Sequence, residues 1–215
     1  MKIVDALTGP ITLSDLAAID AVVKRDELLV MPTDTVYGIA SVPFAPAAVA
    51  RLQQAKGRGE DFPPPVLVSG PAALEELMAP EPQASASQRR AARVLAERFW
   101  PGALTIIVTA NPALGWDLGQ THGTIALRQP DHPVALEILG HTGPLAVTSA
   151  NLHTRPPATD IAAATEYFGE RVSVYVDAGP SLSGHPSTIV SLAQGSPRLV
   201  RQGDIPLADI LAALA

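Results

Sequence analysis

The stretch ELLVMPTDTVYG, residues 27–38, joins a short apolar run to a loop that is rich in hydroxyl groups. The run ends at Pro32, which predicts a buried strand that stops there. The loop carries three hydroxyl side chains and one carboxylate, from Thr33, Asp34, Thr35 and Tyr37. These groups could cap a helix, or they could line a pocket for a small polar molecule. In an α/β sheet such a loop lies at the carboxyl end of its strand, where ligands usually bind.

Helical and strand patterns alternate along the rest of the chain. Apolar residues at helical spacing predict a first helix at 13–26, with Ser14 as a cap near its start. Further helices are predicted at 46–57, 71–78, 85–100, 133–140, 159–169 and 206–215. Further strands are predicted at 65–70, 104–110, 124–129, 145–150, 172–179, 187–192 and 197–203. This alternation predicts a single α/β domain over residues 1–215, with a mixed sheet and antiparallel pairing among the last three strands.

The composition favours a compact protein with a well-buried core. Hydrophobic residues make up 47% of the chain and charged residues 17%. No apolar run approaches the roughly 18–20 residues that cross a bilayer, and the start MKIVDALTGP lacks the apolar segment of a signal peptide. We therefore expect a cytoplasmic protein that makes no membrane contact. The net charge of −6 argues against non-specific coating of nucleic acid but is compatible with a local basic pocket.

Several common chemistries are excluded by what the chain lacks. It has no cysteine, which rules out disulfides, thiolate catalysis and cysteine-ligated zinc. Neither of the two standard glycine-rich phosphate loops is present. GPSLSG, residues 179–184, resembles a nucleophile elbow but has Ser183 in place of the second glycine. The five histidines never fall at i, i+3 or i, i+4, so we expect no histidine metal site.

Basic and hydroxyl residues recur where predicted helices and strands end. Lys56 and Arg58 flank Gly57 at the end of a helix; taken alone, this pair is best explained by the helix dipole. Ser149 and Asn151 follow a strand, where turn formation explains them about as well as ligand binding does.

Two more strands carry polar residues at informative positions. Thr124 and Arg128 are four residues apart on one strand and therefore share a face. Arg128 lies within an apolar strand, so it is expected to meet a carboxylate from the protein or from a ligand. Ser187 begins one strand and Arg201 ends the next. None of these features identifies a function alone. Their order along the chain is more informative than any one of them.

Seven motifs in order resemble the YrdC-like family of threonylcarbamoyl-adenylate synthases in its single-domain form. They are PTDTVYG, KGR, FWPGALT, TIALRQPDHP, TSAN, PSTIV and RLVRQG. The resemblance runs from about residue 12 to residue 210 and implies a twisted α/β fold with a deep, electropositive concave face. It implies a nucleotidyltransferase that converts L-threonine, bicarbonate and ATP to threonylcarbamoyl-AMP and pyrophosphate. Mg²⁺ would arrive with ATP, and no organic cofactor is implied.

The resemblance also implies partners and residue roles. The product would pass to downstream proteins that make threonylcarbamoyladenosine in tRNA, and a transient contact with tRNA is compatible with this role. Threonine would contact Thr35, Arg128, Val147 and Ser187, with Arg128 on its carboxylate. The nucleotide would contact Lys56, Arg58, Thr124, Ser149, Asn151 and Arg201. Lys56 and Arg58 would bind the ATP phosphates as the catalytic residues, and no residue is implied to bind a metal.

Gly59 follows KGR where a proline is frequent in this family, and three further positions depart from the family pattern at expected substrate contacts. Pro64 stands where an asparagine is usual, Ser69 where a histidine often contacts threonine, and Pro157 where a serine often meets ATP. The segment EDFPPP, residues 60–65, is also two residues longer than usual. These departures leave open a paralogue with altered activity.

Two other functions are compatible with the same motifs. A noncatalytic RNA- or nucleotide-binding member could use the same basic concave face, although the acidic net charge and the low aromatic content disfavour it. A carbamoyl-transfer domain of hydrogenase maturation would normally come with zinc-finger cysteines and an acylphosphatase domain. The chain shows neither of these.

Overall fold

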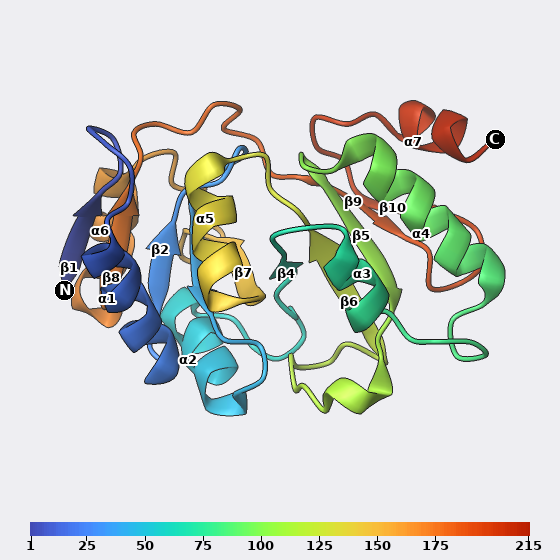
Figure 1. The fold of residues 1–215 in the computed structure, drawn as a ribbon, viewed down its shortest axis with the longest axis horizontal. Helices are drawn as coiled ribbons and strands as arrows, with labels where there is room; N and C mark the ends of the chain where they lie inside the picture. Colours follow the sequence, from blue (N-terminus) through green and yellow to red (C-terminus); the bar gives the residue numbers. More distant parts are fainter.

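Figure 1 shows the computed structural model, which describes all residues 1–215. The strands are β1 (Lys2–Asp5), β2 (Leu29–Met31), β3 (Gly38–Ser41), β4 (Val66–Leu67), β5 (Leu104–Thr109), β6 (Thr124–Arg128), β7 (Leu145–Ser149), β8 (Val174–Asp177), β9 (Thr188–Ser191) and β10 (Arg198–Arg201). The helices are α1 (Leu13–Lys24), α2 (Pro46–Lys56), α3 (Ala72–Leu77), α4 (Ala86–Phe99), α5 (Pro133–Thr142), α6 (Ile161–Phe168) and α7 (Leu207–Leu214). Short 3₁₀ turns lie at Pro112–Leu114 and Gly169–Arg171.

The strands form one sheet in the order β1-β8-β2-β3-β7-β4-β6-β5-β9-β10. The pairs β1–β8, β8–β2, β4–β6 and β5–β9 are parallel, and the other neighbouring pairs are antiparallel. The predicted α/β class with a mixed sheet and flanking helices is therefore confirmed. The sheet runs along the long axis of the molecule, and the two termini lie at its opposite ends (Figure 1).

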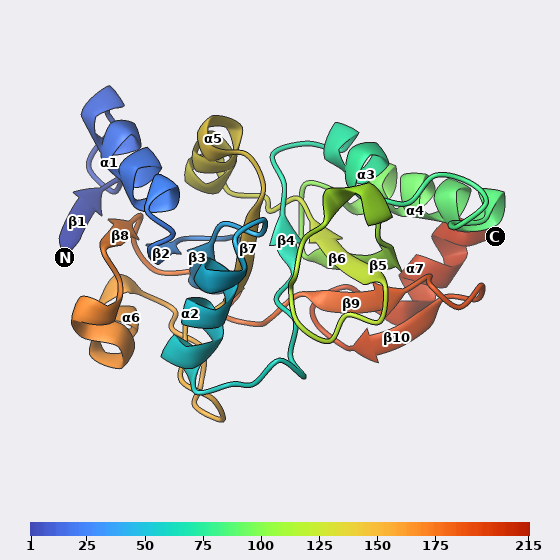
Figure 2. The ribbon, with the colours of Figure 1, turned by 90° about the horizontal axis from the view of Figure 1, so that it is seen from below.

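Helices cover both faces of the sheet. Figure 2 shows α1, α5, α3 and α4 on one side of the strands and α2 and α6 on the other. Strand β2 is buried on both faces, so alternate side chains join different clusters. Leu29 and Met31 pack with α1 and α5, whereas Val30 packs with α2 and α6. None of the helices has both the length and the apolar character that crossing a membrane requires.

The loop after β2 does not begin a helix, so the capping explanation of residues 33–35 is wrong. The chain instead turns back into β3, which pairs with β2 in antiparallel register, Met31 opposite Gly38. The threonine hydroxyls close this turn and leave no free helical amides to cap. The sequence patterns had not predicted β3 because its residues, GIAS, include two small residues with low strand propensity.

Other boundaries differ from the sequence prediction for local reasons. Thr12, not Ser14, is the N-cap of α1: its hydroxyl accepts the Asp15 amide, and Asp15 completes a capping box. Helix α2 begins at Pro46 as predicted, and Gly57 ends it in the left-handed conformation at φ 67°. Strand β1 had also not been predicted.

The last three strands are not consecutive neighbours in the sheet. Antiparallel pairing of β9 with β10 is confirmed. Strand β8, however, is parallel to β1 and β2 at the other end of the sheet, so the prediction for the full set of three is wrong. The chain between β8 and β9, residues 178–187, crosses from one end of the sheet to the other. This crossing brings its far end to the site described below.

Gly38 gives a direct test of the contact between β3 and β7. A Cβ atom at this position would lie 2.5 Å from Val147 Cγ1, and the stiff valine side chain has little room to move. We expect Gly38→Ala to lower the free energy of unfolding by about 1–3 kcal/mol in urea denaturation.

Gly140 is the matched control, because it lies within α5 and a Cβ there meets nothing within 4 Å. Gly140→Ala is expected to leave the stability unchanged or to raise it by up to about 1 kcal/mol. Equal effects of the two substitutions would contradict the packing described here.

Candidate active site

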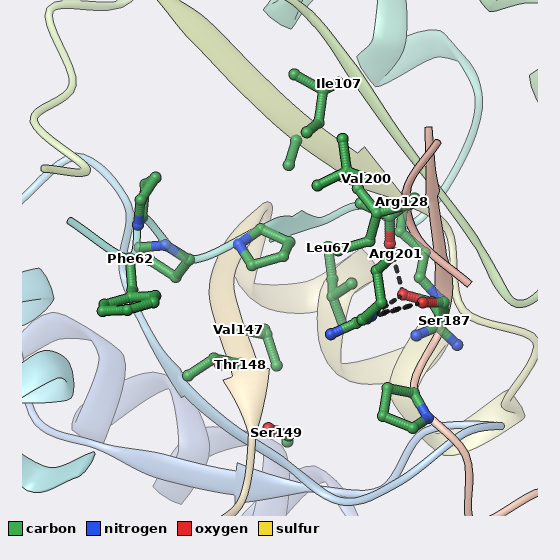
Figure 3. Close-up of a pocket in the computed structure, with 18 of the residues that line it drawn as sticks. Phe62, Leu67, Ile107, Arg128, Val147, Thr148, Ser149, Ser187, Val200 and Arg201 are labelled. Carbon is green, nitrogen blue, oxygen red and sulfur yellow. Dashed lines mark hydrogen bonds between the residues drawn. The ribbon is translucent and has the colours of Figure 1, made fainter. Parts of the chain in front are cut away.

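A cavity of about 350 Å³ is bounded by strands from both halves of the sheet. Its walls come from β3 and β7 on one side, from β4, β5 and β6, and from β9 and β10 on the other side. The loop at residues 58–65 forms part of its rim. Figure 3 shows Arg128, Arg201 and Ser187 at one end, Phe62 at the other, and Val147 between them.

The loop at residues 32–37 presents a hydroxyl group to this cavity. Thr33 Oγ1 donates to the carbonyl of Val36 at 2.6 Å and accepts the Thr35 amide at 3.2 Å. The hydroxyls of Thr33 and Thr35 lie 3.0 Å apart, and both side chains are buried. Tyr37 turns its hydroxyl away to Gly179, donating to that carbonyl at 2.7 Å, so this hydroxyl is not free for a ligand.

Arg128 is the buried cation of the cavity. Its Nη2 lies 2.5 Å from Asp34 Oδ1, its Nη1 donates to Thr35 Oγ1 at 2.9 Å, and its Nε donates to the carbonyl of Gly102 at 2.9 Å. The two side chains of the ion pair are only 7% and 12% exposed. Burial lowers the pKa of Arg128, and the charge of Asp34 opposes that shift. The carboxylate expected beside Arg128 is therefore present in the protein itself.

Arg201 and Ser187 complete the same end of the cavity. Arg201 donates from Nε and Nη2 to the Ser187 carbonyl, at 3.0 and 2.8 Å, and from Nη2 to Ser187 Oγ at 3.1 Å (Figure 3). Ser187 Oγ also lies 2.8 Å from Thr105 Oγ1. Partial burial of the Arg201 guanidinium, then the positive charges of Arg128 and Arg58, lower the pKa of Arg201. No carboxylate pairs with Arg201, so it carries a net positive charge into the cavity.

Arg58 belongs to the opposite rim. Its guanidinium lies 5.5 Å from the centroid of the Phe62 ring, and its Nε donates to His153 Nδ1 at 3.2 Å. Burial lowers the pKa of Arg58. Like Arg201, Arg58 has no carboxylate within ion-pair distance, so both ends of the cavity attract anions.

Lys56 and Asn151 do not line the cavity, although the family resemblance had implied nucleotide contacts for both. Lys56 is 1% exposed, and its Nζ donates to the carbonyl of Ser149 and to the carbonyl and Oδ1 of Asn151, the latter two at 2.8 and 3.2 Å. Asn151 is also buried and supports the turn behind the cavity wall. The remaining predicted site residues all line the cavity: Thr35, Arg58, Thr124, Arg128, Val147, Ser149, Ser187 and Arg201.

Sequence reasoning missed several members of the site. Asp34 was expected to cap a helix or to line a pocket, yet it is the partner of Arg128. Thr105 is a polar residue inside the apolar strand LTIIVT, a signal that could have pointed to the cavity. Phe62 lies in the segment with unusual length and had no pattern to reveal it.

The chemistry of the cavity is that of an anion site. No three His, Cys, Asp or Glu side chains are grouped to hold a metal ion. Arg58 and Arg201 supply positive charge, and threonine and serine hydroxyls supply neutral donors and acceptors. Such a lining can hold phosphate and carboxylate groups in position.

Comparison with protein-family models identifies the family of the chain. Residues 21–203 match the model of the Sua5/YciO/YrdC family, whose description is telomere recombination. The chain belongs to this family.

Members of the Sua5/YciO/YrdC family from bacteria and archaea are similar over most of the chain. A Mycobacterium leprae protein is 47% identical over 195 residues, 91% of this chain and 86% of its own length. The Bacillus subtilis protein named threonylcarbamoyl-AMP synthase is 36% identical over 201 residues, 93% of this chain and 56% of its own length. The M. leprae protein carries the same name in a provisional form.

A solved member of the family shares the fold in detail. The crystal structure of Pyrococcus abyssi Sua5 complexed with L-threonine superposes with a TM-score of 0.86 at 29% identity. The match covers 99% of this chain and 61% of the archaeal chain. The present chain therefore spans less than two thirds of that protein and of the B. subtilis relative.

The three positions that depart from the family pattern lie differently in the structure. Pro64 lines the cavity, and Ser69 is exposed while its carbonyl accepts a hydrogen bond from Gln129 at 3.1 Å. Pro157 does not line the cavity. Only Pro64 therefore changes the cavity wall directly.

The ion pair between Arg128 and Asp34 predicts a large effect on stability. Removal of one partner of a buried pair leaves the other charge uncompensated, which costs about 3–5 kcal/mol. We expect Asp34→Ala to lower the free energy of unfolding by about 3 kcal/mol.

Asp20 offers the comparison, since its ion pair with Lys24 on α1 is largely exposed. We expect Asp20→Ala to cost less than about 1 kcal/mol. Denaturant unfolding of both variants measures the two changes in the free energy of unfolding. A loss below about 1 kcal/mol for Asp34→Ala would show that the pair is not needed for stability.

Proposed function

We propose that this protein makes threonylcarbamoyl-AMP and pyrophosphate from L-threonine, bicarbonate and ATP. The proposal depends on one observation. A single cavity is lined by Arg128, which is buried and keeps free N–H donors, and by Arg58 and Arg201, which have no carboxylate partner. Such a cavity suits an amino acid and a polyphosphate side by side. The names of the relatives and the threonine complex of the archaeal homologue support the same reaction.

Threonine is proposed to bind beside Arg128. The guanidinium has five N–H donors, and its bonds to Gly102, Thr35 and Asp34 use three of them. Two donors remain for the substrate carboxylate. Asp34 cancels most of the charge of Arg128, so the carboxylate is recognised by directed hydrogen bonds and by the nearby charge of Arg201.

The other contacts with threonine are proposed to come from hydroxyl groups and one apolar wall. Thr35 and Ser187 present their hydroxyls at the same end of the cavity. Val147 lines the cavity between the two ends and offers an apolar surface to the substrate methyl group (Figure 3).

The nucleotide is proposed to occupy the remainder of the cavity. Its phosphates would lie between Arg58 and Arg201, which approach the cavity from opposite sides. Thr124 and Ser149 line the walls between them. Their hydroxyl protons are donated to the Thr121 carbonyl and to Asn151 Oδ1, so their oxygens are available as acceptors for the ribose hydroxyls. This placement brings the α-phosphate next to the threonine amine.

The proposed chemistry needs positioning and charge rather than a protein nucleophile. The threonine amine and bicarbonate form a carbamate with release of water. A carbamate oxygen then bonds to the α-phosphorus while the bond to the pyrophosphate oxygen breaks, and pyrophosphate leaves with that electron pair. Arg58 and Arg201 are placed to stabilise the negative charge that builds up on the phosphates. Alignment of the two reactants supplies much of the remaining acceleration.

Mg²⁺ is proposed to enter as a complex with ATP. Asp61 is the one carboxylate among the lining residues, and a single carboxylate beside arginines and hydroxyls fits a metal held by the phosphates themselves. The bound metal would add positive charge to the phosphates. The product is proposed to serve the modification of tRNA to threonylcarbamoyladenosine.

The direct test is an assay with ATP, Mg²⁺, L-threonine and ¹⁴C-bicarbonate. We expect pyrophosphate release that depends on threonine and a labelled product that contains both AMP and threonine. D-threonine serves as the stereochemical control. Absence of threonine-dependent pyrophosphate release would refute the proposal, and salt-sensitive tRNA binding without nucleotide binding would favour the noncatalytic alternative.

Arg128→Ala is predicted to abolish this activity. The substitution removes both free donors and strands the threonine carboxylate, a loss of charged hydrogen bonds worth roughly 1.5–3 kcal/mol each. Threonine binding measured by calorimetry should weaken by at least about tenfold, whereas ATP binding should change much less.

Arg90→Ala is the control, because Arg90 is exposed on α4 and does not line the cavity. Circular dichroism shows whether Arg128→Ala still folds. Arg128→Lys keeps a partner for Asp34 but loses the planar fork, so it should also impair threonine binding. Wild-type turnover in either Arg128 variant would rule out this role.

A further inference from the structure

Lys56 has no donor left for a substrate. Its ammonium group carries three N–H bonds, and three oxygen atoms surround it: the carbonyls of Ser149 and Asn151 and the Oδ1 of Asn151. The side chain is 1% exposed and contributes nothing to the lining of the cavity. A direct contact between Lys56 and the phosphates would require these bonds to break.

The segment that Lys56 holds is part of the wall of the cavity. Ser149 lines the cavity, and its hydroxyl donates to Asn151 Oδ1 at 2.5 Å. Asn151 Nδ2 donates to the carbonyls of Leu152 and Arg155, both at 2.8 Å. The amide of His153 donates to the carbonyl of Lys56 at 2.8 Å. Lys56 therefore joins the end of α2 to residues 149–153 twice: its ammonium group donates to this segment, and its backbone carbonyl accepts from it.

Gly57 explains why Lys56 and Arg58 behave differently. The left-handed conformation of this residue turns the chain at the end of α2. Lys56 then lies behind the wall, whereas Arg58 lines the cavity. The two cations belong to one short segment but face different surroundings.

We propose that Lys56 is a positioning residue whose ammonium ties the 149–151 turn to the end of α2, and that nucleotide phosphates bound at Arg58 strengthen this tie. The inference rests on the proposed binding of ATP in the cavity. It replaces the direct contact with phosphate that the family resemblance implied for Lys56.

The electrostatic surroundings of Lys56 supply the coupling. Burial first, and then the positive charge of Arg58, lower the pKa of Lys56 to about 7. The other titratable groups on neighbouring elements are His153, bonded to the Lys56 carbonyl, and Arg171, which donates to the Ala55 carbonyl at 3.2 Å. No carboxylate lies within ion-pair distance of Lys56. Anionic phosphates at Arg58 would offset its repulsion and favour the charged form of Lys56.

The sign of the expected pH effect follows from this coupling. Binding favours protonated Lys56, so the pKa of Lys56 is higher in the complex than in the free protein. ATP affinity is then greatest below about pH 7 and falls as the pH rises through the free value of about 7. Each unit by which binding raises the pKa corresponds to about a tenfold fall in affinity at high pH.

Titration calorimetry of ATP with excess Mg²⁺ tests the inference. The measurements use two buffers of different ionisation enthalpy from about pH 6 to about pH 9. The wild-type protein should take up protons on binding above about pH 7. Lys56→Met keeps an unbranched side chain, one atom shorter, but removes the charge, and it should remove this proton uptake. Lys24→Met, at an exposed position on α1, should behave as the wild type.

Kinetics separate positioning from a general loss of structure. Lys56→Met should raise the KM for ATP and leave the KM for threonine nearly unchanged. Equal proton uptake in the wild type and in Lys56→Met would overturn the inference. If Lys56→Met does not fold, absence of proton uptake by the wild type at about pH 8 would overturn it as well. Failure of ATP to bind the wild type at all would instead refute the proposed function.

Discussion

The buried ion pair between Arg128 and Asp34 is the contact on which the architecture of the cavity depends. It joins the end of β6 to the loop between β2 and β3. In the sheet, β7 and β4 lie between β3 and β6. A guanidinium at this depth needs a counter-charge, and Asp34 provides it from the loop that also presents Thr35. The same contact therefore fixes the position of a hydroxyl group and leaves part of the guanidinium free.

The remaining charges are arranged around this neutral pair. Arg58 and Arg201 lie on opposite sides of the cavity without a carboxylate partner, whereas Lys56 is turned away and saturated by backbone and amide oxygens. An acidic chain with net charge −6 thus keeps a positive cavity by leaving two arginines unpaired. Burial lowers the pKa of Arg201 and of Lys56 most, and repulsion by the neighbouring arginines lowers both values further. A polyphosphate bound as proposed would relieve that repulsion, so the repulsion among the cations would contribute to ligand affinity.

Local patterns in the sequence predicted much of the fold and some of the polar residues that line the cavity. Alternation of apolar runs predicted the larger strands and helices, and strand ends with hydroxyl or basic residues predicted Thr124, Ser149, Ser187 and Arg201. The partner of Arg128 could not be predicted, because Asp34 and Arg128 are far apart in the chain. The direction of Lys56 depends on the turn at Gly57 and on three acceptors from residues 149–151, which no local pattern shows. Strand β8 was misplaced because pairing follows the path of the chain across the sheet rather than the length of a link.

The chain that crosses between the two halves of the sheet also constrains the cavity. The Tyr37 hydroxyl donates to the Gly179 carbonyl and accepts the Ala178 amide at 3.1 Å, and the Gly184 amide donates to the Thr35 carbonyl at 2.9 Å. The crossing segment is thus bonded at two places to the loop that carries Thr35, immediately before it delivers Ser187 to the cavity. Hydroxyls from the two halves are therefore placed by one continuous set of hydrogen bonds. A reaction that depends on alignment of two bound reactants requires such a connection, because a small shift of one half would separate the proposed carboxylate site from the proposed phosphate site.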